Sequence, residues 1–308
     1  MAGRTGRWRA FALNNEIVYL FLRSPAAQIA AFIAIVMIAA TMAAPLIAPT
    51  DPFDLSTFTI LDSFLPPVWT GEGDARFLLG TDDQGRDLLS SILYGARLSI
   101  LVGGASIVFA VVVGVSLGTI AGYFGGWLDM LIMRIADVQL SLPAIMTALL
   151  IDGVARGILP AARHDDLMFY VLVAAIGLSL WVNFARTARA STLVERGKEY
   201  VQAAEILGVN RFRILLTHIL PNIRGPIMVI MTVDLAVAVL LEATLSFLGV
   251  GVPASQPSLG TLIRIGNDYV FSGEWWVVAF PALTLIILII SVNIVGDFLR
   301  DALNPKLR

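Results

Sequence analysis

Six long apolar stretches constrain the fold of this chain more than any other feature of its sequence. A helix needs about 20 apolar residues to cross a hydrocarbon core of about 30 Å, and it satisfies its own backbone hydrogen bonds there. We therefore expect an all-α, polytopic membrane protein with six transmembrane helices, the fifth running from Pro226 to about Leu248. The stretches are residues 24–50, 98–128, 135–151, 167–185, 225–263 and 275–296.

The composition leaves little room for a catalytic or metal-binding domain. Hydrophobic residues make up 57% of the 308 positions and charged residues 14%, so no large water-soluble domain accompanies the apolar stretches. The chain has no cysteine, and its two histidines, His164 and His218, are far apart in sequence. We expect no catalytic residue, metal site or bound cofactor in this chain. A net charge of −2 gives no reason to expect nucleic acid as a partner.

The distribution of basic residues predicts the orientation. If the N-terminus is cytoplasmic, only 6 of the 21 Lys and Arg residues lie on the outer side, as the positive-inside rule requires. A cleavable signal peptide is the competing interpretation of residues 1–48, but the apolar stretch is longer than usual and has no convincing cleavage site. The predicted segments are a cytoplasmic N-terminal segment (1–23), a first helix (24–50), an extracytoplasmic loop (51–97), a five-helix core (98–299) with a cytoplasmic loop (186–224), and a cytoplasmic tail (300–308).

The basic loop contains a helix, a turn and a second helix. Residues 199–222 read EYVQAAEILGVNRFRILLTHILPN, in which Gly208 can end the first helix in a left-handed conformation and Asn210 can cap the second. Helical spacing places Tyr200, Ala203, Ala204 and Leu207 on one small apolar face. A helix this short is marginal alone in water, so the face must rest on something. It either packs on the membrane surface or the chain's own helices, or docks into a groove on a cytoplasmic partner.

This loop resembles the E-A-A-x3-G-x9-I-x-L-P motif of the membrane subunits of ATP-binding-cassette (ABC) importers. Ala203, Ala204, Gly208 and Leu220-Pro221 match, whereas Gln202 replaces the Glu and His218 stands at the Ile position. In that family the loop is the coupling helix that docks on the ATPase subunit. The resemblance implies contact with the ATPase through Tyr200, Ala203, Ala204, Gly208, Val209, Arg211 and Phe212.

Three more motifs are similar to those of the C-type permeases of dipeptide and oligopeptide importers. They are LGTDDQGRDLLSSILYGARLSILVG (79–103), EATLSFLGVG (242–251) and NIVGDFLRDALNP (293–305). The resemblance implies a type I ABC importer permease fold in a bacterial inner membrane and a homologous permease subunit in a heterodimer. It also implies two ATPase subunits that bind ATP and Mg, and an extracytoplasmic binding protein. Related permeases handle peptides, glutathione, nickel chelates, opines or oligosaccharides.

Three acids within the apolar stretches are candidates for the translocation pathway. A charge near the bilayer centre costs about 2.5–3.5 kcal/mol unless it faces water, pairs or is protonated. Asp234 and Glu242 share one side of the fifth helix, which should face a cavity or a partner chain. Asp137 either lines the pathway or pairs with Arg134. The same acids would serve an alternative function, an ion-gradient-driven secondary transporter or channel, whereas an intramembrane enzyme would need the acids closer together.

Two further patterns predict local structure. Asp87 follows an Asp-rich turn at Gly85 and can cap a short interfacial helix that ends near Tyr94. The alternative for this turn is direct contact with a substrate-delivering protein outside. Small residues recur every four positions along the second apolar stretch and predict close packing against another helix, which either seals the bundle or forms a surface on which helices slide during a transport cycle. This strip contains Ser106, Ala110, Gly114, Gly118, Gly122 and Gly126.

Overall fold

The computed structural model describes residues 16–54, 56, 58–158, 164–251, 256 and 258–303. Most of the predicted N-terminal segment and of the predicted tail therefore lies outside the described residues. The helices in chain order are α2 (Glu16–Arg23), α3 (Pro25–Met42), α4 (Ala44–Ile47), η1 (Ile60–Asp62), α5 (Leu88–Phe124), α6 (Gly126–Leu140), α7 (Ala144–Ile158), α8 (His164–Arg196), α9 (Glu199–Ile206), α10 (Arg211–Ile214), the π-helical turn η3 (Leu215–Ile219), α11 (Leu220–Phe247), α12 (Leu259–Tyr269), η4 (Val270–Ser272) and α13 (Trp276–Leu303). Between Thr81 and Asp87 lies an isolated β-bridge.

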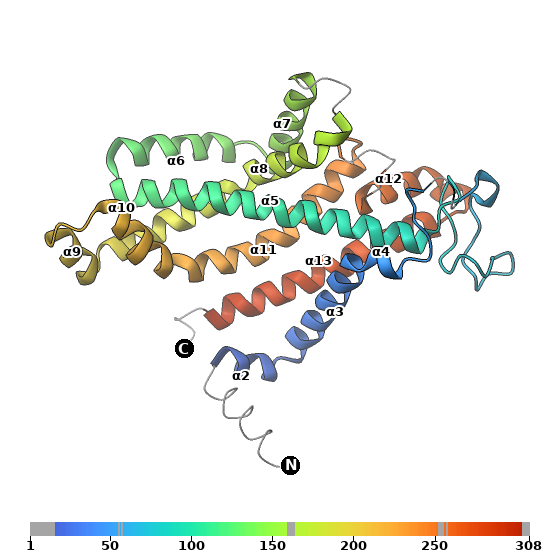
Figure 1. Ribbon diagram of the computed structural model, residues 1–308, viewed down its shortest axis with the longest axis horizontal. Coiled ribbons are helices and arrows are strands. Elements are labelled where there is room, and N and C mark those ends of the chain that lie inside the picture. Colours follow the sequence, from blue (N-terminus) through green and yellow to red (C-terminus); the bar gives the residue numbers. More distant parts are fainter. Residues whose placement is uncertain are drawn as a thin grey trace, which may run out of the picture.

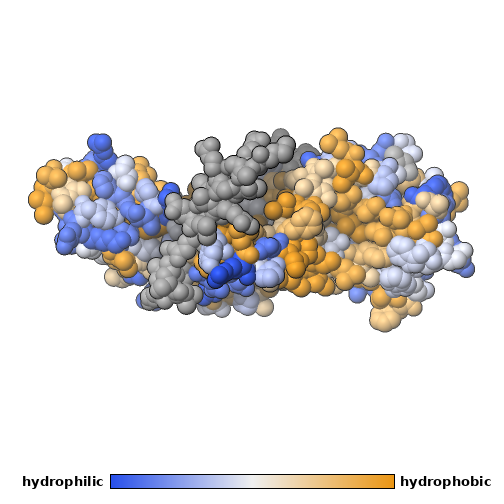
Figure 2. Space-filling view, turned by 90° about the horizontal axis from the view of Figure 1, so that it is seen from below, coloured by the Kyte–Doolittle hydropathy of each residue, from blue (hydrophilic) through white to orange (hydrophobic). Residues whose placement is uncertain are grey.

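The long helices form an elongated bundle. Figure 1 shows α5, α8 and α11 along its length, with α9 and α10 at one end and α12 with the 51–87 segment at the other. Within the described residues, five segments are long and apolar enough to cross a membrane: Pro25–Met42, Leu88–Phe124, Leu167–Arg196, Arg211–Phe247 and Trp276–Ala302. A sixth crossing results if α6 and α7 together make one broken span, which agrees with the six predicted. Figure 2 shows a broad hydrophobic area right of the centre of the visible face, with hydrophilic surface in the centre and toward both ends.

The third predicted span is not one straight helix. Residues 135–151 are divided between α6 and α7, which are bent by 97° around Pro143. Proline lacks the backbone N–H that a continuing helix needs and disfavours helical backbone at Leu142 before it. As a result α6 lies beside α5 and α7 projects from the bundle (Figure 1).

The strip of small residues joins α5 to α8. A Cβ atom built on Gly114 would lie 2.4 Å from the backbone oxygen of Trp181, and one on Gly118 would lie 2.1 Å from that of Ala185. The two backbones therefore approach closely, as predicted. Gly126 is an exception, because it lies beyond the end of α5 and open space surrounds it. Its positive φ and that of Gly125 end the helix at Phe124, four residues before the predicted boundary at 128.

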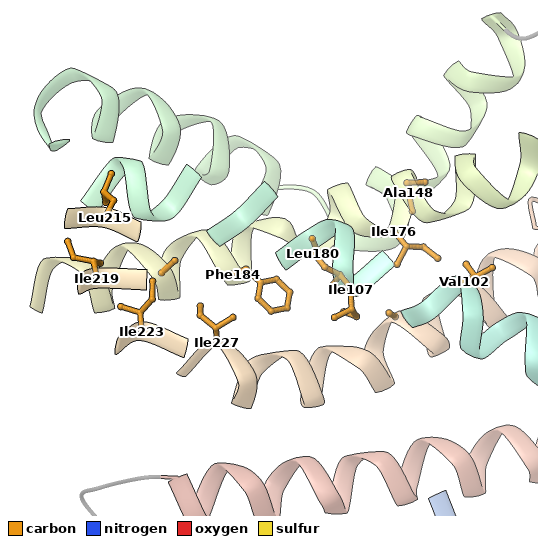
Figure 3. Close-up of a cluster of buried hydrophobic side chains, with 14 of the residues drawn as sticks. Val102, Ile107, Ala148, Ile176, Leu180, Phe184, Leu215, Ile219, Ile223 and Ile227 are labelled. Carbon is orange, nitrogen blue, oxygen red and sulfur yellow. The ribbon is translucent and has the colours of Figure 1, made fainter. Parts of the chain in front are cut away.

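Phe184 lies at the centre of the largest core cluster. This α8 ring is fully buried between α5 and α11, with Ile107 on one side and Ile227 on the other (Figure 3). The cluster continues toward the α9 end through Leu215, Ile219 and Ile223, and it includes Val201 of α9. One apolar core therefore links the three long helices to the short helix at their end.

The opposite end is closed by the 51–87 segment and α12. Asp82 forms a buried ion pair with Arg86 at 2.6 Å, and the indole Nε1 of Trp276 donates a hydrogen bond to the carbonyl of Thr81 at 3.2 Å. Asp87 caps α5 by accepting a hydrogen bond from the Ser90 N–H, as predicted. The helix it starts does not end near Tyr94, because α5 continues without a break into the membrane-spanning segment. Residues 88–97 of the predicted loop are therefore helical.

Candidate functional site

The α9–α10 hairpin (residues 199–214) contains all seven residues expected to contact an ATPase. Helix α8 ends at Arg196, and α9 starts two residues after Gly197. Gly208 has φ +73, which confirms the predicted left-handed turn after α9. Asn210 accepts a hydrogen bond from the Phe212 N–H at 2.9 Å and so caps α10 as predicted. The basic loop predicted at 186–224 consists of the end of α8, this hairpin, the turn η3 and the start of α11.

Of the four residues on the predicted apolar face of α9, only Ala204 is buried within this chain. Val201 and Ala204 are buried against the chain's own helices, whereas Ala203 is exposed. Ile206 is 85% exposed and Leu207 is 81% exposed. The predicted apolar face combined two sides of the helix, because helical spacing alone does not show which side meets the bundle. The Phe212 ring of α10 is also exposed.

Tyr200 connects the hairpin to α8 and α11. Its hydroxyl donates to a carboxylate oxygen of Glu195 at 2.6 Å and accepts from the Asn222 amide at 3.0 Å. Its ring stacks on that of His218, with ring centres 6.2 Å apart. Burial of the hydroxyl, together with its hydrogen bond to Glu195, raises the pKa of Tyr200 above the ordinary value, so it remains a donor at neutral pH.

The end of α5 holds the other side of the hairpin. The hydroxyl of Tyr123 donates to Glu205 of α9 at 2.9 Å, and the ring of Phe124 contacts that of Phe212. The hairpin is thus hydrogen-bonded to α5, α8 and α11. Tyr123 was not among the predicted site residues. The sequence offers only one indication of this role, which is that the Tyr123 hydroxyl is a polar group near the end of an apolar stretch.

A cavity of about 820 Å³ lies between α8, α11 and the end of α13. Asp234 lies in its wall and accepts a hydrogen bond from the Asn183 amide at 3.1 Å. Of the three predicted pathway acids it alone is among the lining residues, which are Asn183, Arg186, Thr187, Gly225, Pro226, Val229, Ile230, Val233, Asp234 and Arg300. Within the described part of the chain, no group of three or more His, Asp or Glu side chains is placed to hold a metal ion.

The other two acids have different surroundings. Asp137 pairs with Arg186 at 2.5 Å, not with Arg134 as one alternative held, and Arg186 in turn lines the cavity. Glu242 does not line the cavity. It is fully buried, and one of its oxygens accepts a hydrogen bond from Ser246 at 2.7 Å. Asp234 and Glu242 lie on the same side of α11, but the surroundings of the helix differ at the two positions: Asp234 faces the cavity, whereas Glu242 is buried outside it.

Asn183, Arg186 and Arg300 line the cavity but were not predicted. Asn183 had a usable signal, because it is the only amide side chain in the apolar stretch 167–185. The arginines had none, since basic residues are expected at the cytoplasmic ends of transmembrane helices whatever they line.

Comparison with known proteins agrees with this architecture. Residues 114–308 match the family model described as the binding-protein-dependent transport system inner membrane component. The chain is 35% identical over 304 residues to the di/tripeptide transport system permease protein DppC of Pseudomonas aeruginosa (strain UCBPP-PA14), covering 98% of this chain and 91% of the relative. It is also 35% identical over 300 residues to the oligopeptide transport system permease protein OppC of Bacillus subtilis (strain 168), covering 97% and 92%.

A solved structure shows the same fold. A chain of the MetNI methionine ABC transporter, described in inward-facing conformations, aligns with 70% of this chain and 97% of its own length at a TM-score of 0.55 and 18% identity. This similarity supports the predicted type I ABC importer permease fold. The chain belongs to the family of binding-protein-dependent transport system inner membrane components, and it is the permease subunit of an ABC importer.

Proposed function

We propose that this permease forms part of the translocation pathway for dipeptides or oligopeptides that an extracytoplasmic binding protein delivers. The peptide permeases among its relatives, similar over nearly the whole chain, support this substrate class. In this proposal the α9 end of the bundle is cytoplasmic, and two ATPase subunits bind ATP and Mg and dock on the α9–α10 hairpins of a permease pair.

The observation that carries the proposal is that the hairpin exposes apolar side chains yet is fixed to the bundle. Ile206, Leu207 and Phe212 extend into solvent, where their exposure is unfavourable unless a partner covers them. Tyr123 and Tyr200 bond the same hairpin to α5, α8 and α11. A displacement of the hairpin by the ATPases is therefore passed to these three helices as a movement of the whole unit, which alternating access requires.

The cavity is the proposed pathway. Its volume of about 820 Å³ is sufficient for a short peptide, and its lining includes Arg186 and Arg300 toward the α9 end and Asp234 deeper in the membrane. These groups offer ion-pair and hydrogen-bond partners to both ends of a zwitterionic peptide. The cavity is only partly enclosed by this chain, and in this proposal a second membrane subunit completes its wall. Asp137 contributes only through its ion pair with Arg186.

The partner subunit is proposed to be a homologous but different permease, which makes the pair a heterodimer. Apolar side chains at Val237 and Leu240 of α11 and at Leu283 and Ile286 of α13 are exposed and available to face that partner or lipid. The family assignment disfavours the alternative of an ion-gradient-driven transporter. Glu242 gives that alternative no support either, because the carboxylate is buried outside the cavity.

Two variants of the exposed hairpin test the proposal. Leu207→Asp and Ile206→Asp place a charge on the proposed docking surface without altering the bonds of Tyr123 or Tyr200. We expect both to abolish peptide uptake and to reduce the amount of ATPase subunit that co-purifies with the permease, while membrane insertion is unchanged. Leu61→Asp is the matched control, since Leu61 is 95% exposed at the opposite end of the bundle. Uptake and ATPase retention that survive both hairpin changes would contradict the docking role.

A further inference from the structure

A small polar pocket opens between the hairpin and the ends of α5 and α8. Its volume is about 200 Å³, and it is separate from the cavity that contains Asp234. The residues that line it come from four elements of the chain, so its shape depends on the hairpin being docked on the bundle. They are Tyr123, Phe124, Arg196, Glu205, Val209 and Arg211.

The charges of this pocket are unbalanced. Arg196 and Arg211 contribute two guanidinium groups, and Glu205 contributes one carboxylate. The Arg196 guanidinium lies 5.6 Å from the centre of the Tyr123 ring, and the Tyr123 hydroxyl already occupies one Glu205 oxygen. Neither arginine forms an ion pair with an acid in the described part of the chain.

The neighbouring basic residues behave differently. Arg186 pairs with Asp137, Arg189 with Asp129, and Lys198 with Glu195. On α8, Arg196 thus differs from Arg186 and Arg189, while Arg211 shares its lack of an ion pair in the described residues with Arg213 but, unlike Arg213, lines the pocket. Two guanidinium groups that converge on a polar pocket without an acid partner create a site for an anion.

We propose that this pocket binds a carboxylate side chain, from an Asp or Glu on the surface of the ATPase subunit. The inference rests on the proposed function, since it assumes that the α9–α10 hairpin meets an ATPase. Two arginines and one glutamate leave a net charge of +1, which matches a singly charged carboxylate. Arginine offers paired N–H groups with the geometry of a carboxylate. The pocket also shares Glu205, Val209 and Arg211 with the hairpin, so a protein covering the exposed Ile206 and Leu207 reaches it without a second contact surface.

A binding measurement in neutral lipid tests the pocket. The assembled permease pair is placed in nanodiscs of phosphatidylcholine, and the ATPase subunit is titrated at several NaCl concentrations. We expect Arg196→Gln with Arg211→Gln to weaken binding about tenfold at low salt and to flatten its salt dependence, because two exposed charge pairs of modest strength are lost. Arg213→Gln is the matched control: it removes the same charge from the same short helix, but Arg213 does not line the pocket.

A cross-link identifies the partner group. In the Arg211→Lys variant, a carbodiimide joins the new amine directly to a carboxylate within ion-pair distance. A link to an Asp or Glu of the ATPase subunit is expected. A link to residues of this chain alone, or no link in a complex that still binds ATPase, would overturn the proposal.

The remaining outcomes distinguish a failure of the carboxylate-site proposal from a failure of the proposed function. If Leu207→Asp abolishes ATPase binding but the double arginine variant binds like the wild type, the docking surface stands and the carboxylate site is wrong. If the arginine variants lose binding only in nanodiscs that contain phosphatidylglycerol, the pocket holds a lipid headgroup and the proposal is again overturned. If the unaltered permease binds no ATPase subunit, the proposed function itself fails.

Discussion

The hydroxyl of Tyr123, in the last turn of α5, donates a hydrogen bond of 2.9 Å to Glu205 of α9, a residue 82 positions later in the chain. This bond directly joins a membrane-spanning helix to the exposed hairpin. Tyr123 is itself buried, with its neighbours Gly122 and Ala121 packed in the bundle, so it offers little freedom to absorb a movement of α9. The link between the hairpin and α5 is therefore a direct side-chain hydrogen bond from a buried residue.

Removing this hydroxyl should loosen coupling without preventing assembly. We expect Tyr123→Phe to retain the ATPase subunit but to lower the number of peptides taken up per ATP hydrolysed. The hydrogen bond between α5 and α9 that is lost contributes about 1 kcal/mol, the usual net contribution of one hydrogen bond. The number of peptides taken up per ATP hydrolysed is measured in proteoliposomes that contain the complete transporter. Tyr94→Phe, at the other end of α5, is the control, and equal ratios for the two variants would contradict the coupling role of Tyr123.

The glycine strip predicts a stability difference between two positions of α5. A Cβ on Gly118 would meet the Ala185 carbonyl oxygen at 2.1 Å, whereas no atom lies within 4 Å of a Cβ on Gly104. Gly118→Ala should destabilise the fold by about 1–3 kcal/mol through overpacking. Gly104→Ala should be neutral or slightly stabilising, because alanine favours a helix. Thermal unfolding of the detergent-purified proteins distinguishes them, and similar midpoints would disprove the close approach of α5 and α8.

Asp234 and Glu242 should differ in what their substitution changes. Asp234 faces the cavity and bonds Asn183, so Asp234→Asn should reduce uptake severalfold with little effect on the midpoint of thermal unfolding. Glu242 is fully buried and accepts from Ser246, so Glu242→Ala should leave a void and an unsatisfied hydroxyl that cost about 2–4 kcal/mol. Uptake per folded molecule and the unfolding midpoint are both measured. A loss of stability for Asp234→Asn, with none for Glu242→Ala, would reverse these assignments.

Arg156 of α7 should hold the loop that follows α11. It pairs with the fully buried Asp152 at 2.7 Å and donates to the carbonyl of Val250 at 3.0 Å. Arg156→Leu leaves the Asp152 charge buried without its cation, which should destabilise the fold by about 1–3 kcal/mol, a figure reduced because Arg156 is partly exposed. Changing both residues to leucine should restore part of that stability. Thermal unfolding of the double-mutant cycle measures the coupling, and additive losses would exclude it.

Much of the hairpin was predictable because its signals are local. A glycine that allows positive φ and an asparagine that caps the next helix act within a few residues, and both occupy the predicted places at Gly208 and Asn210. Which side of α9 is buried was not predictable in the same way. Helical spacing groups residues into faces, but only the packing of α9 against Tyr123 and the bundle decides that Val201 is inside and Leu207 outside.

The sequence by itself determined the membrane architecture, since apolar stretches of bilayer length can be satisfied only as helices. It also determined the breaks at Pro143 and Gly125, although neither was predicted, and the close approach of α5 through its small residues. Tertiary structure decided what depends on distant residues: the pairing of Asp137 with Arg186, the division of Asp234 and Glu242 between a cavity and a buried site, and the unpaired arginines beside Tyr123. The physical reason is the distance along the sequence over which each kind of interaction acts. Backbone preferences act over one or two helical turns, whereas charges and cavities depend on which helices the folded chain places side by side.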